Sequence, residues 1–155
     1  MKLRYPYESK FSLEFGNIST IKLLLSVESS TGLIPFTFLL DTGADVSSLP
    51  ASAASKLGID LSKCPKIPMS GFEGSTISVY KSKIKIRLNK QSFSTNKQSF
   101  STNKQSFSTN EKSISVPCVF NPNDDVPILL GRAGIIDRFN IFMDGKKKEI
   151  TFEEL

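Results

Sequence analysis

The stretch FTFLLDTGADVSSLP, residues 36–50, places an acidic side chain at the end of an apolar run. Four hydrophobic residues and a threonine lead into Asp41, and Thr42, Gly43 and Ala44 that follow are too small to cover a charge. A carboxylate at the end of an apolar strand loses hydration unless neighbouring donors or a shared proton compensate. Small residues after it let backbone N–H groups and a ligand come close, and they allow a tight turn. We therefore interpret Asp41 as a carboxylate at the floor of a cleft.

The size and hydropathy of the chain fit a single domain. Its 155 residues are 39% hydrophobic and include 12 Phe, which is enough for one core. No window approaches the roughly 18 continuous apolar residues of a membrane span. The first ten residues, MKLRYPYESK, lack the apolar region of a secretory signal. We expect one domain over residues 1–155, a cytoplasmic location and no membrane association.

Histidine is absent, which excludes several reaction mechanisms. Ser-His-Asp and Cys-His hydrolysis, and zinc sites that use imidazole ligands, all need this side chain. Acid–base chemistry must come from carboxylates, Lys, Tyr or Cys. Cys64 and Cys118 lie outside any metal-type spacing and are most simply reduced, buried side chains, with a disulfide as the minority alternative. We expect no metal and no organic cofactor.

The positive charge is mild and scattered. The formal net charge is +5, and Lys81, Lys83, Lys85 and Arg87 alternate with mostly apolar residues. A two-residue period is typical of a strand with one solvated face, and we favour this interpretation over a nucleic-acid-binding patch. Residues 145–148, GKKK, occupy a predicted turn with the same explanation. No nucleic-acid partner is expected.

The pattern along the chain is mostly β. Residues 21–29 and 33–40 predict a hairpin around a turn at 30–32, and residues 1–16 predict an extended arm or first strand. Residues 51–59 predict a short helix that stops at Gly58, followed by a Pro-containing link over 64–68. The remaining expectations are a hairpin tip at 71–74, strands at 75–88 and 113–120, a buried apolar run with a short helix and a strand over 127–142, and a final strand at 149–152 after an Asp-Gly turn.

The unit KQSFSTN occurs three times in tandem over residues 90–110. A seven-residue period raises the possibility of a coiled coil, but each unit has one Phe and no second apolar heptad position. We interpret the repeat as a low-complexity insertion in the loop between two strands. Such growth is tolerable, because loop closure costs only about 0.6 kcal/mol per doubling of length.

Three segments in order resemble the retropepsin family, the retroviral-type aspartic proteases and their bacterial relatives. They are LLDTGAD (39–45), MSGFEGSTISVY (69–80) and VPILLGRAGIIDRF (126–139). The resemblance covers about two-thirds of the chain, from Ile21 to Phe142 without the repeat. Asp-Thr-Gly alone also suits an ordinary turn, but the three segments together favour the protease interpretation. The resemblance implies a mostly β, single-lobe acid protease barrel with one or two short helices, which forms half of a symmetric dimer.

The resemblance also implies roles at the Asp-Thr-Gly segment. Asp41 would be the catalytic carboxylate, and Thr42 would form a hydrogen bond across the dimer. Gly43 and Ala44 would shape the floor of the cleft and offer backbone contacts to an extended peptide. Because the chain has one such motif, activity would require a homodimer in which the two Asp41 side chains meet at the two-fold axis.

The second segment is similar to the family's flap, a hairpin tip that closes over substrate. Gly71, Phe72, Glu73 and Gly74 would form this tip, with Phe72 as an apolar cover. The segment departs from the glycine-richer viral flaps, and a charge at Glu73 is not part of their pattern.

The third segment implies structural support. Asp45 and Arg132 match positions where an acid and an arginine pair behind the active site, and Arg132 directly follows Gly131. The function implied is that of an aspartic endopeptidase that hydrolyses peptide bonds of a peptide or protein substrate. The alternative is a catalytically weak or inactive dimeric module with the same fold that grips an extended peptide by strand addition.

Overall fold

A computed structural model describes residues 1–71, 74–88 and 112–155 of the chain. Its strands are β1 (Lys2–Pro6), β2 (Glu8–Ser12), β3 (Gly16–Thr20), β4 (Lys22–Ser29), β5 (Gly32–Leu40), β6 (Ser47–Pro50), β7 (Lys66–Ser70), β8 (Thr76–Leu88), β9 (Lys112–Asn121), β10 (Leu129–Leu130), β11 (Phe139–Asp144) and β12 (Glu149–Glu154). The helices are α1 (Ala51–Leu57) and one 3₁₀ turn, η1 (Leu61–Lys63). The repeat at 90–110 and flap positions 72–73 lie outside the described residues.

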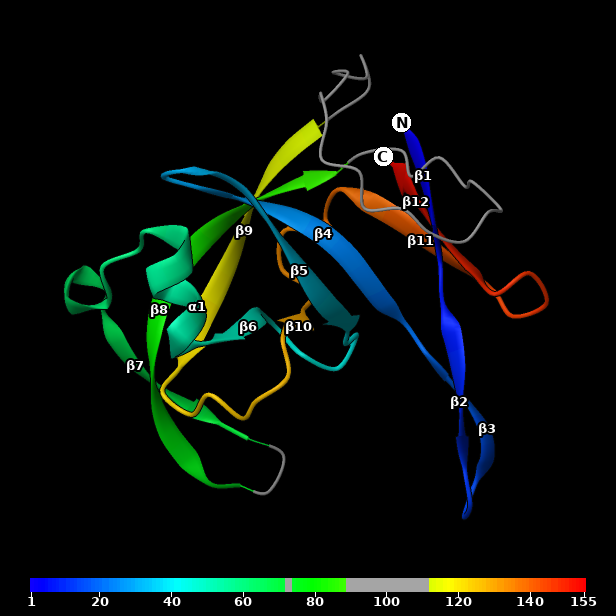
Figure 1. Cartoon of the computed structure of the whole chain (residues 1–155), viewed down its shortest axis with the longest axis horizontal. Helices are drawn as coiled ribbons and strands as arrows, with labels where there is room; N and C mark the ends of the chain where they lie inside the picture. The colour runs from blue at the N-terminus through cyan, green and yellow to red at the C-terminus, as the bar shows by residue number, and fades with distance from the viewer. Residues whose placement is uncertain (72–73, 89–111) are drawn as a thin grey trace.

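The central element is a seven-stranded sheet in the order β4-β5-β10-β6-β9-β8-β7 (Figure 1). An additional pairing of β4 with β8 brings distant strands of this order together, so the sheet curls into a barrel. Its longest ladder joins β8 to β9. The expected barrel is therefore confirmed.

The core fills this barrel and continues under a second, three-stranded sheet. That sheet has the order β1-β12-β11 and joins the two ends of the described chain. Tyr5 packs edge-to-face on Phe152, and Phe152 on Phe139, so one aromatic cluster covers the inner face of the sheet. The hairpins β4–β5 and β11–β12 form where the sequence predicted them.

The helix α1 forms as predicted and ends where a glycine allows it. Ala53, Ala54 and Leu57 are buried on one face. Gly58 adopts a left-handed conformation with φ of 72°, and its N–H bonds to the last turn of the helix.

The second predicted helix, after Gly131, is wrong. Residues 132–138 instead form two successive hydrogen-bonded turns. The N–H groups of Ile135 and Ile136 both donate to the carbonyl oxygen of Arg132. Gly134, which lies between Arg132 and Ile135, has φ of 76°. A left-handed residue cannot be part of a right-handed helix, so these turns do not join into a regular helix.

Two further differences concern strands. The Pro-containing segment 64–68, expected to be a link, ends in strand β7, which pairs with β8 as the last strand of its sheet. The N-terminal arm contains strand β1, as expected, and then a separate hairpin, β2–β3, that was not expected.

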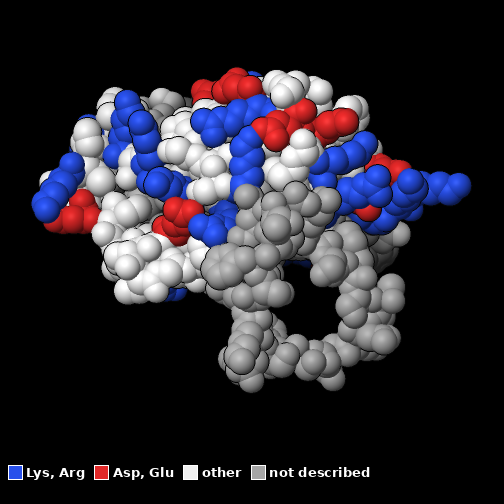
Figure 2. Space-filling model, turned by 90° about the horizontal axis from the view of Figure 1, so that it is seen from above, with Lys and Arg blue, Asp and Glu red and all other residues white. Residues whose placement is uncertain are grey.

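Charges on the surface are mixed in sign. On the face shown in Figure 2, Lys and Arg side chains lie among Asp and Glu side chains. Ion pairs on the terminal sheet include Lys2–Glu153 and Arg4–Glu149, and Lys112 of β9 pairs with Glu154 of β12. Along β8, Lys81, Lys83 and Lys85 are exposed and alternate with less exposed residues, as a solvated strand face requires.

Candidate active site

Asp41 lies at the end of β5, where three strands meet. The short strand β10 runs parallel to β5, with Leu130 beside Leu40, and antiparallel to β6. The backbone N–H of Asp41 donates to the carbonyl oxygen of Leu130 at 3.0 Å. The apolar run before Asp41 is thus a strand of the barrel, and its register with β10 fixes the position at which the carboxylate emerges.

The loop after β5 turns tightly around the Asp41 side chain. Gly43 N–H donates to Asp41 Oδ1 at 2.9 Å, and Ala44 N–H donates to the Asp41 carbonyl oxygen at 3.3 Å. Asp41 is half-buried, whereas Thr42 and Gly43 are exposed. No basic side chain of the described chain forms an ion pair with Asp41. The carboxylate is oriented by a backbone donor and stays accessible at the surface of this single chain.

Gly131 supports the loop from behind. A Cβ atom at this position would lie 2.4 Å from the carbonyl carbon of Val46, so only glycine fits. Its N–H donates to the buried Ser47 Oγ at 3.1 Å. Ser47 is completely buried. It was not among the predicted site residues, because its partner lies 84 residues away in the chain.

Arg132 continues this support through its backbone and side chain. Its N–H donates to the Ala44 carbonyl oxygen at 3.0 Å, and Ala133 N–H donates to the Asp45 carbonyl oxygen at 2.9 Å. The guanidinium of Arg132 pairs with the Asp45 carboxylate, as the sequence predicted. Both side chains are open to solvent, with exposed fractions of 45% for Arg132 and 84% for Asp45.

The predicted flap corresponds to the tip of the β7–β8 hairpin. Ser70 pairs with Thr76, Gly71 N–H donates to the Ser75 carbonyl oxygen at 3.0 Å, and Gly74 closes the turn with φ of 74°. Phe72 and Glu73 lie outside the described residues. In Figure 1 this hairpin extends beyond the barrel at its lower side. No hydrogen bond among the described residues joins the tip to the Asp41 loop.

Comparisons with known proteins agree with this geometry. The sequence profile described as "Aspartyl protease" matches residues 26–133, from the first barrel strand to the turn after Gly131. This match spans well over half of the chain, and the chain therefore belongs to the aspartyl protease family. No curated protein matches the sequence significantly.

A solved structure with the same architecture is a retropepsin-like aspartic protease from Rickettsia conorii. The TM-score is 0.51 at 15% sequence identity, and the alignment covers 96% of this chain and 95% of that chain. At this identity the likeness establishes the fold, which is retropepsin-like.

Two features are absent from the described residues. None of the helices is long and apolar enough to cross a membrane. No group of three or more Cys, Asp and Glu side chains there is arranged to hold a metal ion.

Proposed function

We propose that this chain is one subunit of a homodimeric aspartic endopeptidase, in which two Asp41 carboxylates activate a water molecule. The observation that carries the proposal is the local geometry of Asp41. It is an accessible carboxylate, oriented by Gly43 N–H and fixed to β10 through Leu130, in a chain of the aspartyl protease family.

The dimer follows from the number of carboxylates that the reaction needs. A single group does not efficiently both take a proton from water and give one to the leaving amine. Two carboxylates held about 3 Å apart cannot both ionise, so they share a proton and divide the two roles. The sequence has one Asp-Thr-Gly motif. A second copy, related by a two-fold axis next to Asp41, supplies the other.

The reaction then follows from this pair. The ionised Asp41 takes a proton from the bound water as the water oxygen attacks the peptide carbonyl carbon. The protonated Asp41 of the other subunit donates a hydrogen bond to the carbonyl oxygen. The tetrahedral intermediate collapses when the first Asp41 passes the proton that it took from water to the amide nitrogen and the C–N bond breaks. The products are a carboxylic acid and an amine, and the pair again holds one proton.

The remaining loop residues have positioning roles in this proposal. Thr42 is exposed on the single chain, which suits a hydrogen bond to the other subunit. Gly43 and Ala44 form the floor along which an extended peptide lies. The tip from Gly71 to Gly74 closes over the peptide and excludes water.

The test is cleavage of a peptide library at mildly acidic pH by the wild type and Asp41→Asn. We expect the variant to lose cleavage and to keep its dimer. Asp60→Asn is the matched control, because Asp60 accepts from Ser62 at a helix start, where Asn caps equally well. Cleavage that survives in Asp41→Asn contradicts the proposal. If neither the wild type nor Asp41→Asn cleaves peptides and both bind them equally, the chain is a peptide-binding module instead.

A further inference from the structure

The hairpin β2–β3 is a two-stranded sheet with no buried residue. Its strands pair only with each other, from Glu8 beside Thr20 to Ser12 beside Gly16. Neither strand contributes a residue to the core. An isolated two-stranded hairpin is at best marginally stable in water, so a hairpin of this kind needs a surface to pack on.

The end of this hairpin is unusually apolar for an exposed element. The exposed fractions are 66% for Phe11, 91% for Leu13, 79% for Phe15 and 43% for Ile18. Ser12 Oγ accepts from the N–H groups of Glu14 and Phe15 at 3.3 Å each, so the turn has a defined structure. Large apolar side chains clustered on one projecting element indicate an interaction surface. We call residues 8–20 the apolar arm.

The root of the apolar arm adjoins the catalytic loop. Ile21, the residue after β3, accepts a hydrogen bond through its carbonyl oxygen from Leu40 N–H at 2.9 Å. Leu40 directly precedes Asp41. Figure 1 shows that the arm then projects beyond the barrel, at its lower right in that view.

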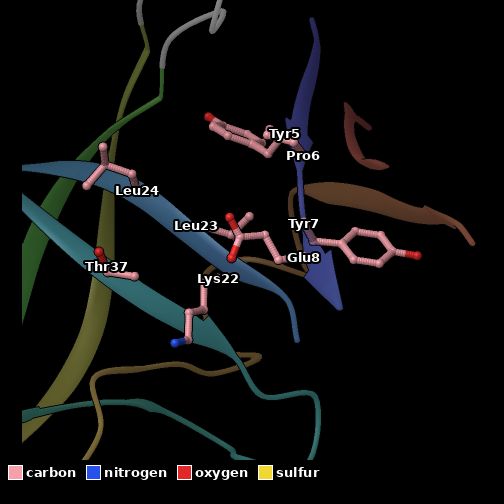
Figure 3. A pocket seen from close by; sticks show the side chains of 8 residues that line it. All are labelled: Tyr5, Pro6, Tyr7, Glu8, Lys22, Leu23, Leu24 and Thr37. Carbon is pink, nitrogen blue, oxygen red and sulfur yellow. The ribbon is translucent and has the colours of Figure 1, made fainter. Parts of the chain in front are cut away.

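The apolar arm does not pack closely on its own barrel. A groove of about 360 Å³ opens at its root, between β1, the start of β2 and the strands β4 and β5 (Figure 3). Glu8 of the arm and Tyr7 just before it line one side, and Lys22, Leu23 and Thr37 line the barrel side. The large apolar side chains of the arm stay exposed, so the adjoining strands do not cover them.

We infer that the apolar arm is a dimerisation element that docks on a second copy of this chain. The inference rests on the proposed homodimer, which brings a second copy to the Asp41 loop. The arm ends one residue before Ile21, which bonds to Leu40 next to Asp41. An arm in this position faces the second copy, and two-fold symmetry uses the same surface on both subunits. Aromatic side chains are enriched in the cores of such interfaces, as they are on this arm. The arms thus clamp the two catalytic loops together.

The test combines the dimer dissociation constant with hydrogen exchange. The double variant Phe11→Ser/Phe15→Ser changes exposed residues only, so its monomer should unfold at the same temperature as the wild-type monomer. We expect its dissociation constant, from sedimentation velocity, to rise by roughly 100-fold or more, since four large apolar side chains per dimer lose their burial. Leu33→Ser is the control, because Leu33 is exposed at the opposite end of β5 from Asp41.

Hydrogen exchange checks the same inference without a variant. The backbone amides of residues 9–19 should exchange more slowly in the wild type at concentrations above the dissociation constant than below it. A dimer that forms without this protection, or that forms equally well in the double variant, overturns the role of the arm and leaves the two-carboxylate proposal standing. A wild type that stays monomeric at every concentration overturns both.

An arm that binds a partner other than the second copy would give different results. Equal dimerisation with a raised KM for peptides in the double variant assigns the arm to substrate. Binding of the wild type, but not the double variant, to phosphatidylcholine vesicles without a change in dimerisation assigns it to lipid. Either result overturns the inference.

Discussion

Gly131 lies against the peptide bond that joins Val46 to Ser47, with no room for a side chain between them. An added Cβ atom would lie 2.4 Å from the Val46 carbonyl carbon and 2.9 Å from the Ser47 nitrogen. Backbone atoms on both sides make this contact rigid. The position of the Asp41 loop therefore depends on the absence of one methyl group.

Gly131→Ala should displace the loop and lower the free energy of unfolding by about 1–3 kcal/mol, the usual cost of overpacking. The rate of peptide cleavage should fall by more than the loss of folded protein explains, because the shift moves Asp41 itself. Chemical denaturation and cleavage rates measure the two effects. Gly145→Ala is the control, since a Cβ there meets nothing closer than Tyr7 Oη at 4.0 Å. Wild-type stability in Gly131→Ala would contradict the described fit.

The ion pair of Asp45 and Arg132 should contribute little to the stability of the single chain. Exposed pairs are typically worth about 1 kcal/mol or less, and the loop is also held by backbone hydrogen bonds from Arg132 and Ala133. We expect Asp45→Asn to change the free energy of unfolding by no more than this, measured below the dimer dissociation constant. A loss above about 2 kcal/mol would show that the pair is a main support of the fold.

The two cysteines should differ in reactivity. Burial raises the pKa of the Cys118 thiol to about 12, and the neighbouring Cys64 adds to the rise. Because the thiolate is the nucleophile, iodoacetamide at pH 8 should alkylate the half-buried Cys64 and spare Cys118 until the protein unfolds. Mass spectrometry of the two peptides measures this. The raised pKa also means that Cys118 contributes stability at neutral pH that is lost as the pH rises above about 9.

Acid should weaken the link between β4 and β8. Arg87 donates to Glu28 Oε1 at 3.0 Å, and this hydrogen bond, with a second from Ser113, lowers the pKa of Glu28 below its ordinary 4.5. A lowered pKa stabilises the fold above the ordinary value, and this contribution is lost as the pH falls through the lower one. Glu28→Gln should therefore be less stable than the wild type at pH 6, and the difference should shrink below pH 4. Thermal unfolding across this range checks the trend, and a difference independent of pH would contradict it.

Sequence patterns predicted the elements whose signal is local. The barrel hairpin, the helix ending at Gly58 and the alternating strand β8 each have one buried face and a turn residue at the end. The hairpin β2–β3 was not predicted because each strand has one large apolar residue, Phe11 or Ile18, so neither strand shows a two-residue hydropathy period. The sequence predicts a link at β7 because Pro65 precedes this strand and Pro68 lies within it, and Pro68 is tolerated because β7 is the last strand of its sheet.

The candidate site divides in the same way. Asp41 and its small neighbours are contiguous, so their pattern predicts a carboxylate in a tight loop. The partnership of Asp45 with Arg132 was expected only from resemblance to a family. Ser47 had no signal, because a buried serine in a strand is recognised as a hydrogen-bond acceptor only when its donor, Gly131, is placed beside it.

The support of the Asp41 loop has a consequence for the order of folding. Arg132 and Asp45 are 87 residues apart, and Gly131 and Ser47 are 84 apart. Contacts of such long sequence separation form late, because the intervening chain must first be ordered. During synthesis, the Asp41 loop is translated early but stays incomplete until the ribosome has released Leu130 to Ala133. A nascent or truncated chain that lacks this segment has the acidic motif without the backbone hydrogen bonds and the ion pair that hold its loop.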